Sequence, residues 1–391
     1  PLELATLIHL SVFLILASWG FGGNAPWSRT AVSWWGSLGI VITAVAINDG
    51  GFGHEGRWRR LRWLWPFALL NLIVLISALN PNFRALTSGS EVLFAKTGGI
   101  SGLPGSARPA LACRALWLFD GIFLSCFNII LIVRQRRSLR GLMLVAVANG
   151  LALAVFGTIQ KFMRAKGLYF GLVKSPQLYF FASFIYHNHW GAFAVLMTAS
   201  CLGLMAHHAR HTHRDFWHSP AFGGLVAVFF LAASIPLSAS RSCTFLVLVL
   251  LAGALLVWLV RTTRHRLDRQ ESIVPPLLGG CAAVAIAGVT AYYLAKPVID
   301  ERLAQTVEQV AQFRTQGSIG SRAIVYRDTW QMARDRILFG WGMASYPTVF
   351  YLYNTQASYT DSQPIFYYDA HSDWLQSLAE LGIVGTLLLG L

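Results

Sequence analysis

Long apolar segments recur along this chain, separated by shorter polar connections. Each has few or no charged side chains over about 18 residues or more, the length that a helix needs to cross a bilayer. Complete segments of this kind lie at residues 3–20, 30–48, 63–80, 115–133, 141–159, 190–206, 220–237, 243–260 and 274–295. Another begins near Trp374, and we expect it to continue beyond Leu391. The pattern predicts an all-α integral membrane protein, a polytopic bundle of about ten visible spans.

The connections between these segments are alternately rich and poor in arginine. The basic ones follow the second, fourth, sixth and eighth segments and contain Arg57, Arg59, Arg60, Arg62, Arg134, Arg136, Arg137, Arg140, Arg210, Arg214, Arg261, Arg264, Arg266 and Arg269. Because basic loops stay in the cytoplasm, this alternation predicts a cytoplasmic N-terminus. Residues 1–295 then form a bundle of nine spans, residues 296–372 form a large loop on the opposite side, and residues 373–391 begin a tenth span.

Composition agrees with a membrane protein. Hydrophobic residues make up 55% of the chain and charged residues only 12%, a balance that a soluble domain does not show. The formal net charge of +14 would suit a nucleic-acid partner, but the arginines follow the membrane topology, so we predict membrane lipids and no nucleic acid as partners. The 5 cysteines show no CxxC spacing and are interpreted as small buried hydrophobic residues.

The loop at residues 296–372 is predicted to be partly helical. Residues 300–313 carry apolar side chains at helical spacing, which indicates an amphipathic helix. A Gly-Ser break follows, and residues 322–338 predict a second helix that ends before a pair of glycines. Residues 343–370 are rich in Tyr, Ser, Thr, Asp and Pro. They predict an irregular segment whose aromatic rings are available to stack on an apolar or sugar surface.

His371 is the first candidate for chemistry, because it stands between this polar loop and the last apolar segment. Histidine accepts a proton near neutral pH, and Asp369 or Asp373 could orient its ring and stabilise the imidazolium. One alternative is an interfacial histidine held by a loop carbonyl. A second is a metal site formed by the alternation of Asp369, His371 and Asp373. That site is disfavoured if Ser372 or Asp373 caps the last helix, with Gln376 completing a capping box.

Three arginines on the side opposite the basic loops are candidates for binding an anion. Arg241 lies between two apolar spans, where an arginine needs an anionic partner or must extend to the interface. If Ser321 is a helix N-cap, Arg322 falls in the first turn, where the helix dipole disfavours a cation unless an anion is present. Arg327 follows on the same helix. Its alternative interpretation is a solvated basic face, supported by Asp328.

The outward connection before the sixth span adds weaker candidates. Lys161 would add positive charge that guides an anionic substrate to the site, or would lie among lipid headgroups. Asn188 would contact a sugar or cap a helix. Several signatures are absent from the sequence. It has no GxxxxGK[ST], no GxGxxG after a strand, no HExxH, and no Asp-x-Asp pair in the outward loops. We therefore predict neither a nucleotide nor a metal cofactor, and any bound diphosphate must be neutralised by arginines.

With these residues assembled, the chain resembles the O-antigen ligase and polymerase family of bacterial envelope glycosyltransferases. The resemblance rests on Leu79-Asn80-Pro81, residues 184–194, Ser240-Arg241, residues 321–330, Phe339-Gly340-Trp341-Gly342 and residues 371–382. It implies a bundle in the bacterial inner membrane, whose large periplasmic loop transfers a glycan from undecaprenyl diphosphate to an acceptor hydroxyl. The family's two diphosphate-binding arginines match Arg241 and Arg322, and its loop histidine matches His371. Ser372 departs from the asparagine that many members have there.

These observations predict a metal-independent, inverting glycosyltransferase with its active site on the periplasmic side. Arg241 and Arg322 would bind the diphosphate, assisted by Arg327, Lys161, Asn188 and Asp369 in the remainder of the substrate site, and His371 would deprotonate the acceptor. We expect an O-antigen ligase with lipid A core as acceptor. A polymerase and a protein O-oligosaccharyltransferase are alternatives within the family. From other classes, Asp120 inside the fourth span favours a transporter, and an assembly or scaffolding protein is a further alternative.

Overall fold

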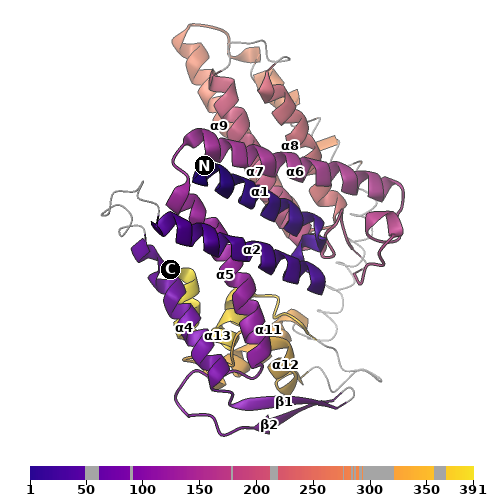
Figure 1. The fold of residues 1–391 in the computed structure, drawn as a ribbon. Helices are drawn as coiled ribbons and strands as arrows, with labels where there is room; N and C mark the ends of the chain where they lie inside the picture. The colour runs from indigo at the N-terminus through magenta and orange to yellow at the C-terminus, as the bar shows by residue number, and fades with distance from the viewer. Residues whose placement is uncertain are drawn as a thin grey trace, which may run out of the picture. The chain divides into compact units, whose positions relative to one another are not determined.

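The structure, a computed structural model, describes residues 1–48, 61–88, 91–177, 179–211, 219–275, 277–282, 285, 288–289, 293, 321–355 and 367–391. The chain divides into two compact units, each described by itself. Unit 1 comprises Pro1–Trp35 and Asn128–Val307, and unit 2 comprises Gly36–Phe127 and Glu308–Leu391. The division falls inside two helices, so that α2 and α5 contribute to both units (Figure 1).

Eight helices in the described part of the chain are long and apolar enough to cross a membrane. They are α1 (Leu2–Trp19), α2 (Pro26–Asn48), α4 (Trp65–Leu79, preceded by the 3-10 turn Arg62–Leu64), α5 (Pro109–Ile132), α6 (Arg136–Phe162), α7 (His187–His211), α8 (Pro220–Leu237) and α9 (Arg241–Asp268). They coincide with the first eight predicted segments, and the helical membrane-protein class is confirmed. The segment predicted at residues 274–295 lies largely outside the described residues, as does the amphipathic helix predicted at 300–313.

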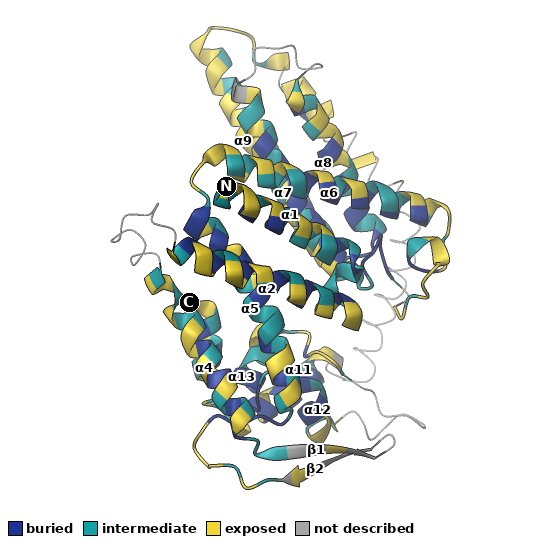
Figure 2. Ribbon diagram, viewed as in Figure 1, coloured by how far each residue is buried: buried dark blue, intermediate teal, exposed yellow. Residues whose placement is uncertain are grey.

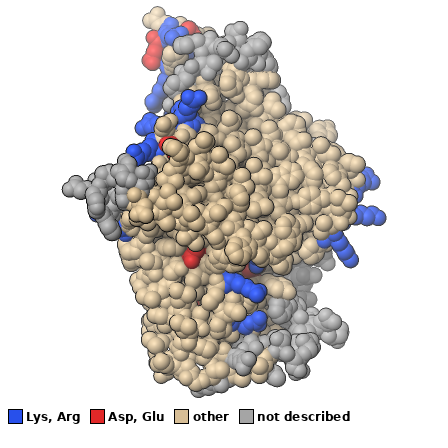
Figure 3. All heavy atoms as spheres, viewed as in Figure 1, with Lys and Arg blue, Asp and Glu red and all other residues tan. Residues whose placement is uncertain are grey.

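The apolar side chains of these helices are largely exposed, which a protein in water would not tolerate over so large an area. Figure 2 shows exposed residues along α1, α2 and α9. In α9 only Cys243 and Val247 are buried, while Phe245 is 66% exposed and Leu256 is 62% exposed. Figure 3 shows that most of the visible face carries no Lys, Arg, Asp or Glu. The chain is therefore a multi-pass membrane protein, with lipid replacing water around these helices.

The core of unit 1 lies where α6, α7 and α8 meet. Leu153 of α6, Trp190 of α7 and Leu231 of α8 are fully buried in one cluster. The connection between α6 and α7 folds back onto this core, because the Phe181 ring stacks on Trp190 with the ring centroids 5.0 Å apart. The connection is thereby fixed to the beginning of α7.

Unit 2 contains a two-stranded antiparallel hairpin, β1 (Phe83–Ser88) with β2 (Glu91–Lys96). The sequence indicated only an outward loop between α4 and α5. The hairpin signal, two runs of six residues around a Gly-Ser pair, was too short to stand out beside the membrane spans. Its first residue, Phe83, packs against Trp341, with the ring centroids 5.4 Å apart.

The C-terminal part of unit 2 consists of α11 (Ser321–Asp335), the single turn α12 (Tyr346–Val349) and α13 (Asp373–Gly390). Helix α11 matches the predicted second loop helix but ends earlier, in a turn that reaches Gly340. Helix α13 begins as predicted, yet it is broken at Gly382, where φ is 66° and ψ is −173°. It is not among the eight helices that meet the requirements for a span.

The break in α13 is bridged by the chain that follows α11, and we call residues 337–342 together with residues 379–384 the crossing. Backbone N–H groups of Trp341 and Gly342 donate to the carbonyls of Ala379 and Glu380, at 3.0 and 2.8 Å. The N–H groups that follow the break, on residues 383 and 384, donate in turn to the carbonyls of residues 337 and 338, at 2.8 and 3.2 Å. The backbone groups around the break are thereby paired.

The crossing predicts that Gly382→Ala destabilises the protein. A Cβ at this position would lie 2.2 Å from the Leu338 carbonyl oxygen, and the backbone conformation is one that only glycine adopts readily. We expect a lower midpoint of thermal unfolding in detergent, from a cost of about 1–3 kcal/mol or more. Gly390→Ala in the same helix is the matched control, because its Cβ would meet nothing within 4 Å. Equal midpoints for the two variants would contradict the described crossing.

Candidate functional site

His371 lies in unit 2, directly before α13, with an exposed side chain. Its φ of 57° is in the left-handed region, which is uncommon for a residue other than glycine. Two neighbouring side chains hold this conformation. The Tyr326 hydroxyl donates to the His371 carbonyl at 3.0 Å, and the buried Ala370 N–H donates to the Gln376 side-chain oxygen at 3.1 Å. The imidazole is therefore presented to solvent from a fixed backbone.

Gln376 connects this turn to the crossing. Its amide nitrogen donates to Glu380 at 3.4 Å, and the buried Glu380 carboxylate accepts the N–H groups of Ala344 and Tyr346 at 2.8 and 3.0 Å. The capping box considered as a condition against a metal site does not form, because Ser372 occupies the N-cap position of α13 without a side-chain cap bond. The reason is that the Gln376 side chain is already bonded to Ala370 and Glu380, so it cannot also reach the N-cap.

Arg322 and Tyr326 share one face of α11, because residues four apart lie one above the other on a helix. Arg322 is exposed in the first turn of α11, and Tyr326 one turn later contacts His371. One turn is a rise of about 5.4 Å. Tyr326 thus links the helix that carries Arg322 to the turn that carries His371, within unit 2. The sequence analysis missed Tyr326, although its spacing of four from Arg322 was the available signal. The Ser321 side chain lies outside the described residues.

Arg327 points to a different set of partners. Its guanidinium lies 3.2 Å from the carboxylate of the buried Asp328 and donates to the Thr355 hydroxyl at 2.9 Å. The other Asp328 oxygen accepts both the N–H and the hydroxyl of Thr355, at 2.9 and 2.8 Å. The exposed Arg327 with Asp328 beside it agrees with the alternative of a solvated face supported by Asp328, which balances its charge. The bonds to Thr355 tie α11 to the segment that follows α12.

Asp369 and Asp373 are both exposed, on either side of His371. Among the described residues, no group of three or more His, Cys, Asp or Glu is arranged to hold a metal ion. The alternating metal site considered from the sequence therefore has no support in this part of the chain. Both carboxylates remain close in sequence to the imidazole that they were predicted to orient.

Several aromatic rings of residues 343–355 are buried in the core and are not free to stack on a sugar. Tyr346 and Phe350 stack with their centroids 4.8 Å apart, and burial raises the pKa of the Tyr346 hydroxyl, which lies 2.9 Å from the hydroxyl of Thr329. Arg336 lies 4.4 Å from the centroid of the Trp341 ring, and burial lowers the pKa of its guanidinium. The prediction of available rings is wrong for these residues.

Two rings on either side of His371 are exposed instead. Tyr368 is 69% exposed and Trp374 is 68% exposed. Because aromatic faces suit the apolar faces of sugars, both side chains are candidate substrate contacts. The exposed Tyr368 agrees with the available rings predicted for residues 343–370, whereas Trp374 was not singled out. Its position near His371 in the sequence was the available signal.

Arg241 lies in unit 1 as the exposed first residue of α9. The preceding residue, Ser240, donates from its hydroxyl to the Asn188 side-chain oxygen at 2.7 Å, and the Asn188 amide donates to the Tyr186 hydroxyl at 2.9 Å. Asn188 therefore fixes the beginning of α9 against the beginning of α7. Gly191 allows this approach, because a Cβ there would lie 2.8 Å from the Cβ of Cys243.

Two helix N-termini are thus joined beside Arg241. The unpaired N–H groups and the dipole of each helix favour an anion at that end, and the arginine adds a full positive charge. Lys161, the third predicted residue in unit 1, lies in the last turn of α6 with its ammonium 5.0 Å from the centroid of the Phe180 ring. Its charge therefore contacts the aromatic connection between α6 and α7.

A family model described as O-antigen ligase matches residues 226–390. This region contains Arg241, Arg322 and His371, whereas Lys161 and Asn188 precede it. The match agrees with the resemblance found in the sequence. No curated protein and no solved structure matches the chain.

The contacts around His371 predict that Gln376→Leu destabilises unit 2. The change leaves the buried Ala370 N–H without its acceptor and removes a donor from Glu380, at a cost of about 1–3 kcal/mol. The measurement is thermal unfolding in detergent. Gln331→Leu, at an exposed position on α11, is the matched control and should leave the midpoint nearly unchanged. If both variants unfold at the wild-type temperature, the bond between Ala370 and Gln376 does not hold the turn.

Proposed function

Because residues 226–390 match a family model described as O-antigen ligase, we propose that this chain is a membrane-bound glycosyltransferase of the ligase type. It moves a glycan from an undecaprenyl diphosphate carrier to a hydroxyl group of the lipid A core. The single observation that carries the assignment is the fixed turn at His371, which presents an exposed imidazole beside the helix of Arg322. A general base needs this combination of access and fixed position.

The imidazole of His371 accepts the proton of the acceptor hydroxyl as its oxygen attacks the anomeric carbon. A bond forms between the acceptor oxygen and that carbon, and the bond to the phosphate oxygen breaks with inversion. The leaving diphosphate takes the electron pair, and its increasing negative charge is stabilised by arginine. No metal or nucleotide is needed in this scheme, because guanidinium groups supply the positive charge.

Arg322 and Arg241 are the proposed diphosphate ligands, each argued from its own surroundings. Arg322 occupies the first turn of α11, where an anion relieves the repulsion between a cation and the helix dipole. Arg241 stands at the joined N-termini of α7 and α9, which is an anion-binding arrangement even without the side chain. Asn188 acts by positioning α9. Asp369 is the proposed ring-orienting carboxylate. Lys161 contributes positive charge within unit 1, and Arg327, whose charge Asp328 balances, supports the substrate site by tying α11 to Thr355.

The rival function, transport, was favoured by one half-buried carboxylate. Asp120 of α5 accepts a hydrogen bond from the Asn71 amide of α4 at 3.0 Å. This bond gives Asp120 a structural partner between two helices of unit 2. The main candidate site residues, Arg241, Arg322 and His371, are instead exposed and lie at helix ends or in the loop. This placement favours the transferase over the transporter.

We further propose that the protein lies in the bacterial inner membrane with residues 296–372 in the periplasm. In a background with the native cysteines replaced by alanine, Leu352→Cys should react with a membrane-impermeant maleimide added to intact spheroplasts. Arg137→Cys should react only after lysis, because its arginine-rich loop is predicted to be cytoplasmic. Both positions are exposed, so that accessibility is matched. Strong labelling of Arg137→Cys in intact spheroplasts would reverse the topology.

The catalytic proposal predicts that binding and transfer separate. His371→Ala should bind the lipid-linked donor as the wild type does, yet slow single-turnover transfer by roughly 10²–10⁴-fold. Arg322→Ala and Arg241→Ala should each weaken donor binding and slow transfer by about 10²-fold or more. Lysine at either position should restore little of the binding or the rate, because it lacks the planar guanidinium that forms two parallel hydrogen bonds.

Arg334→Ala is the matched control on the exposed surface of α11 and should transfer normally. EDTA should not change the rate of the purified enzyme. Normal transfer by His371→Ala would refute the base, and loss of activity in EDTA would restore the metal alternative. Comparing lipid A core with a repeat-unit acceptor in the same assay separates ligase from polymerase.

A further inference from the structure

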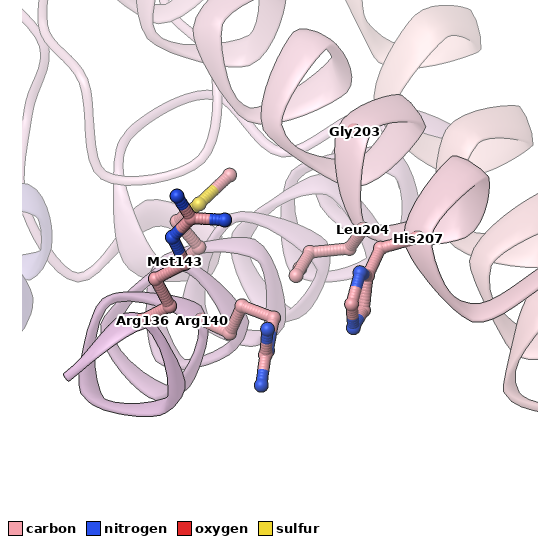
Figure 4. Close-up of a pocket in the computed structure, with 6 residues that line it drawn as sticks. All are labelled: Arg136, Arg140, Met143, Gly203, Leu204 and His207. Carbon is pink, nitrogen blue, oxygen red and sulfur yellow. The ribbon is translucent and has the colours of Figure 1, made fainter. Parts of the chain in front are cut away.

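Unit 1 has a pocket of about 500 Å³ between α6 and α7, at the end of these helices that is far from Asn188 and Lys161. Its lining is Arg136, Arg140 and Met143 of α6 with Gly203, Leu204 and His207 of α7 (Figure 4). None of these residues belongs to the proposed active site. The pocket is wide because Gly203 has no side chain: a Cβ there would meet only the methyl group of Met143, at 4.0 Å.

The lining changes from charged to apolar along the helix axes. Arg136, Arg140 and Met143 have the spacing of one helix face, with the two arginines nearer to the beginning of α6. On α7, His207 lies nearer to the end of the helix, and Leu204 lies about one turn deeper. Figure 4 shows the side chains of Arg140 and His207 extending from facing helices toward the same side. Both helices are candidate membrane spans, so the apolar part of the pocket faces the bilayer interior.

The two arginines at the charged end have no carboxylate counter-ion among the described residues. No carboxylate in the described part of the chain lies within 4.0 Å of the Arg136 or Arg140 guanidinium nitrogens. Glu3, which approaches this turn, is engaged with the Gln135 N–H at 3.3 Å and with the Ser138 side chain. The dipole at the N-terminus of α6 opposes further positive charge there, so an anion would be stabilised.

We propose that this pocket binds an anionic phospholipid. The phosphate diester lies between Arg136, Arg140 and His207, which offer charge-assisted hydrogen bonds, and an acyl chain lies along Met143 and Leu204. A phospholipid has the same order of charged and apolar parts as the lining. A soluble phosphate would fill only the charged end. The arginine pattern predicts that this end faces the cytoplasm, where a basic loop meets the anionic inner leaflet.

The test uses the full chain, purified in detergent and titrated with dioctanoyl-phosphatidylglycerol, with bound lipid counted by native mass spectrometry. Wild type should bind one molecule far more tightly than it binds dioctanoyl-phosphatidylcholine, which has no net charge. Arg136→Gln/Arg140→Gln should weaken phosphatidylglycerol binding by about tenfold or more. Arg137→Gln/Arg264→Gln removes the same net charge from exposed positions outside the pocket and should change binding less than about twofold.

A second variant keeps the charge and fills the space. Gly203→Phe places a ring where the pocket is open and should reduce phosphatidylglycerol binding as strongly as the double arginine variant. Unchanged binding by Gly203→Phe, or equal losses in the two double variants, would show that the lipid binds the basic surface in general and would overturn the proposal. Glycerol 3-phosphate that displaces the lipid at equal concentration would do the same, because the site would then be one for a soluble phosphate. None of these readouts depends on glycosyl transfer.

Discussion

A helix interrupted at Gly382 imposes the main physical requirement on unit 2. Breaking a helix leaves carbonyls before the break and N–H groups after it without intrahelical partners, and burying such groups unpaired is costly. The crossing satisfies them with backbone alone, through four hydrogen bonds between residues 337–342 and residues 379–384. Backbones can approach so closely only where a side chain is missing, which explains the glycine at the break. The chain after α11 is therefore locked to α13.

A chain of hydrogen bonds connects the crossing to the turn that carries the proposed base, His371. Glu380 lies inside the crossing, and its carboxylate anchors both the beginning of α12 and the Gln376 side chain. Gln376 then holds the Ala370 N–H, and Tyr326 of α11 holds the His371 carbonyl. The exposed side chain of the proposed base thus rests on a buried polar network whose members are bonded to one another. The turn at His371 and helix α11, which carries Arg322, both connect to the crossing. A change in the crossing therefore affects the positions of both residues.

The membrane spans could be predicted from the sequence because the bilayer demands both length and hydrophobicity, and a signal of that size survives without tertiary information. Arg322 and His371 could be singled out because polar groups stand out beside apolar spans. The break at Gly382, the role of Gln376 and the burial of Tyr346 could not be predicted. The break at Gly382 and the burial of Tyr346 depend on partners that are distant in the sequence, and Gln376 bonds to a loop N–H that no periodic pattern marks. Local patterns favoured an unbroken helix, a cap and an exposed loop. The hairpin was missed for a related reason, since short strands have weak signals.

Helix α9 is packed against the rest of unit 1 mainly at its beginning, and this affects how it responds to a change in bilayer thickness. Only Cys243 and Val247, in its first two turns, are buried, and Ser240 directly before it is bonded to Asn188. The remaining turns rely on lipid for their surroundings. When the thickness of the hydrocarbon layer changes, a span adjusts by tilting, and a span held at one end tilts about that end. Arg241 stands at the held end, so hydrophobic mismatch is absorbed at the opposite end of α9 while the guanidinium keeps its place beside α7.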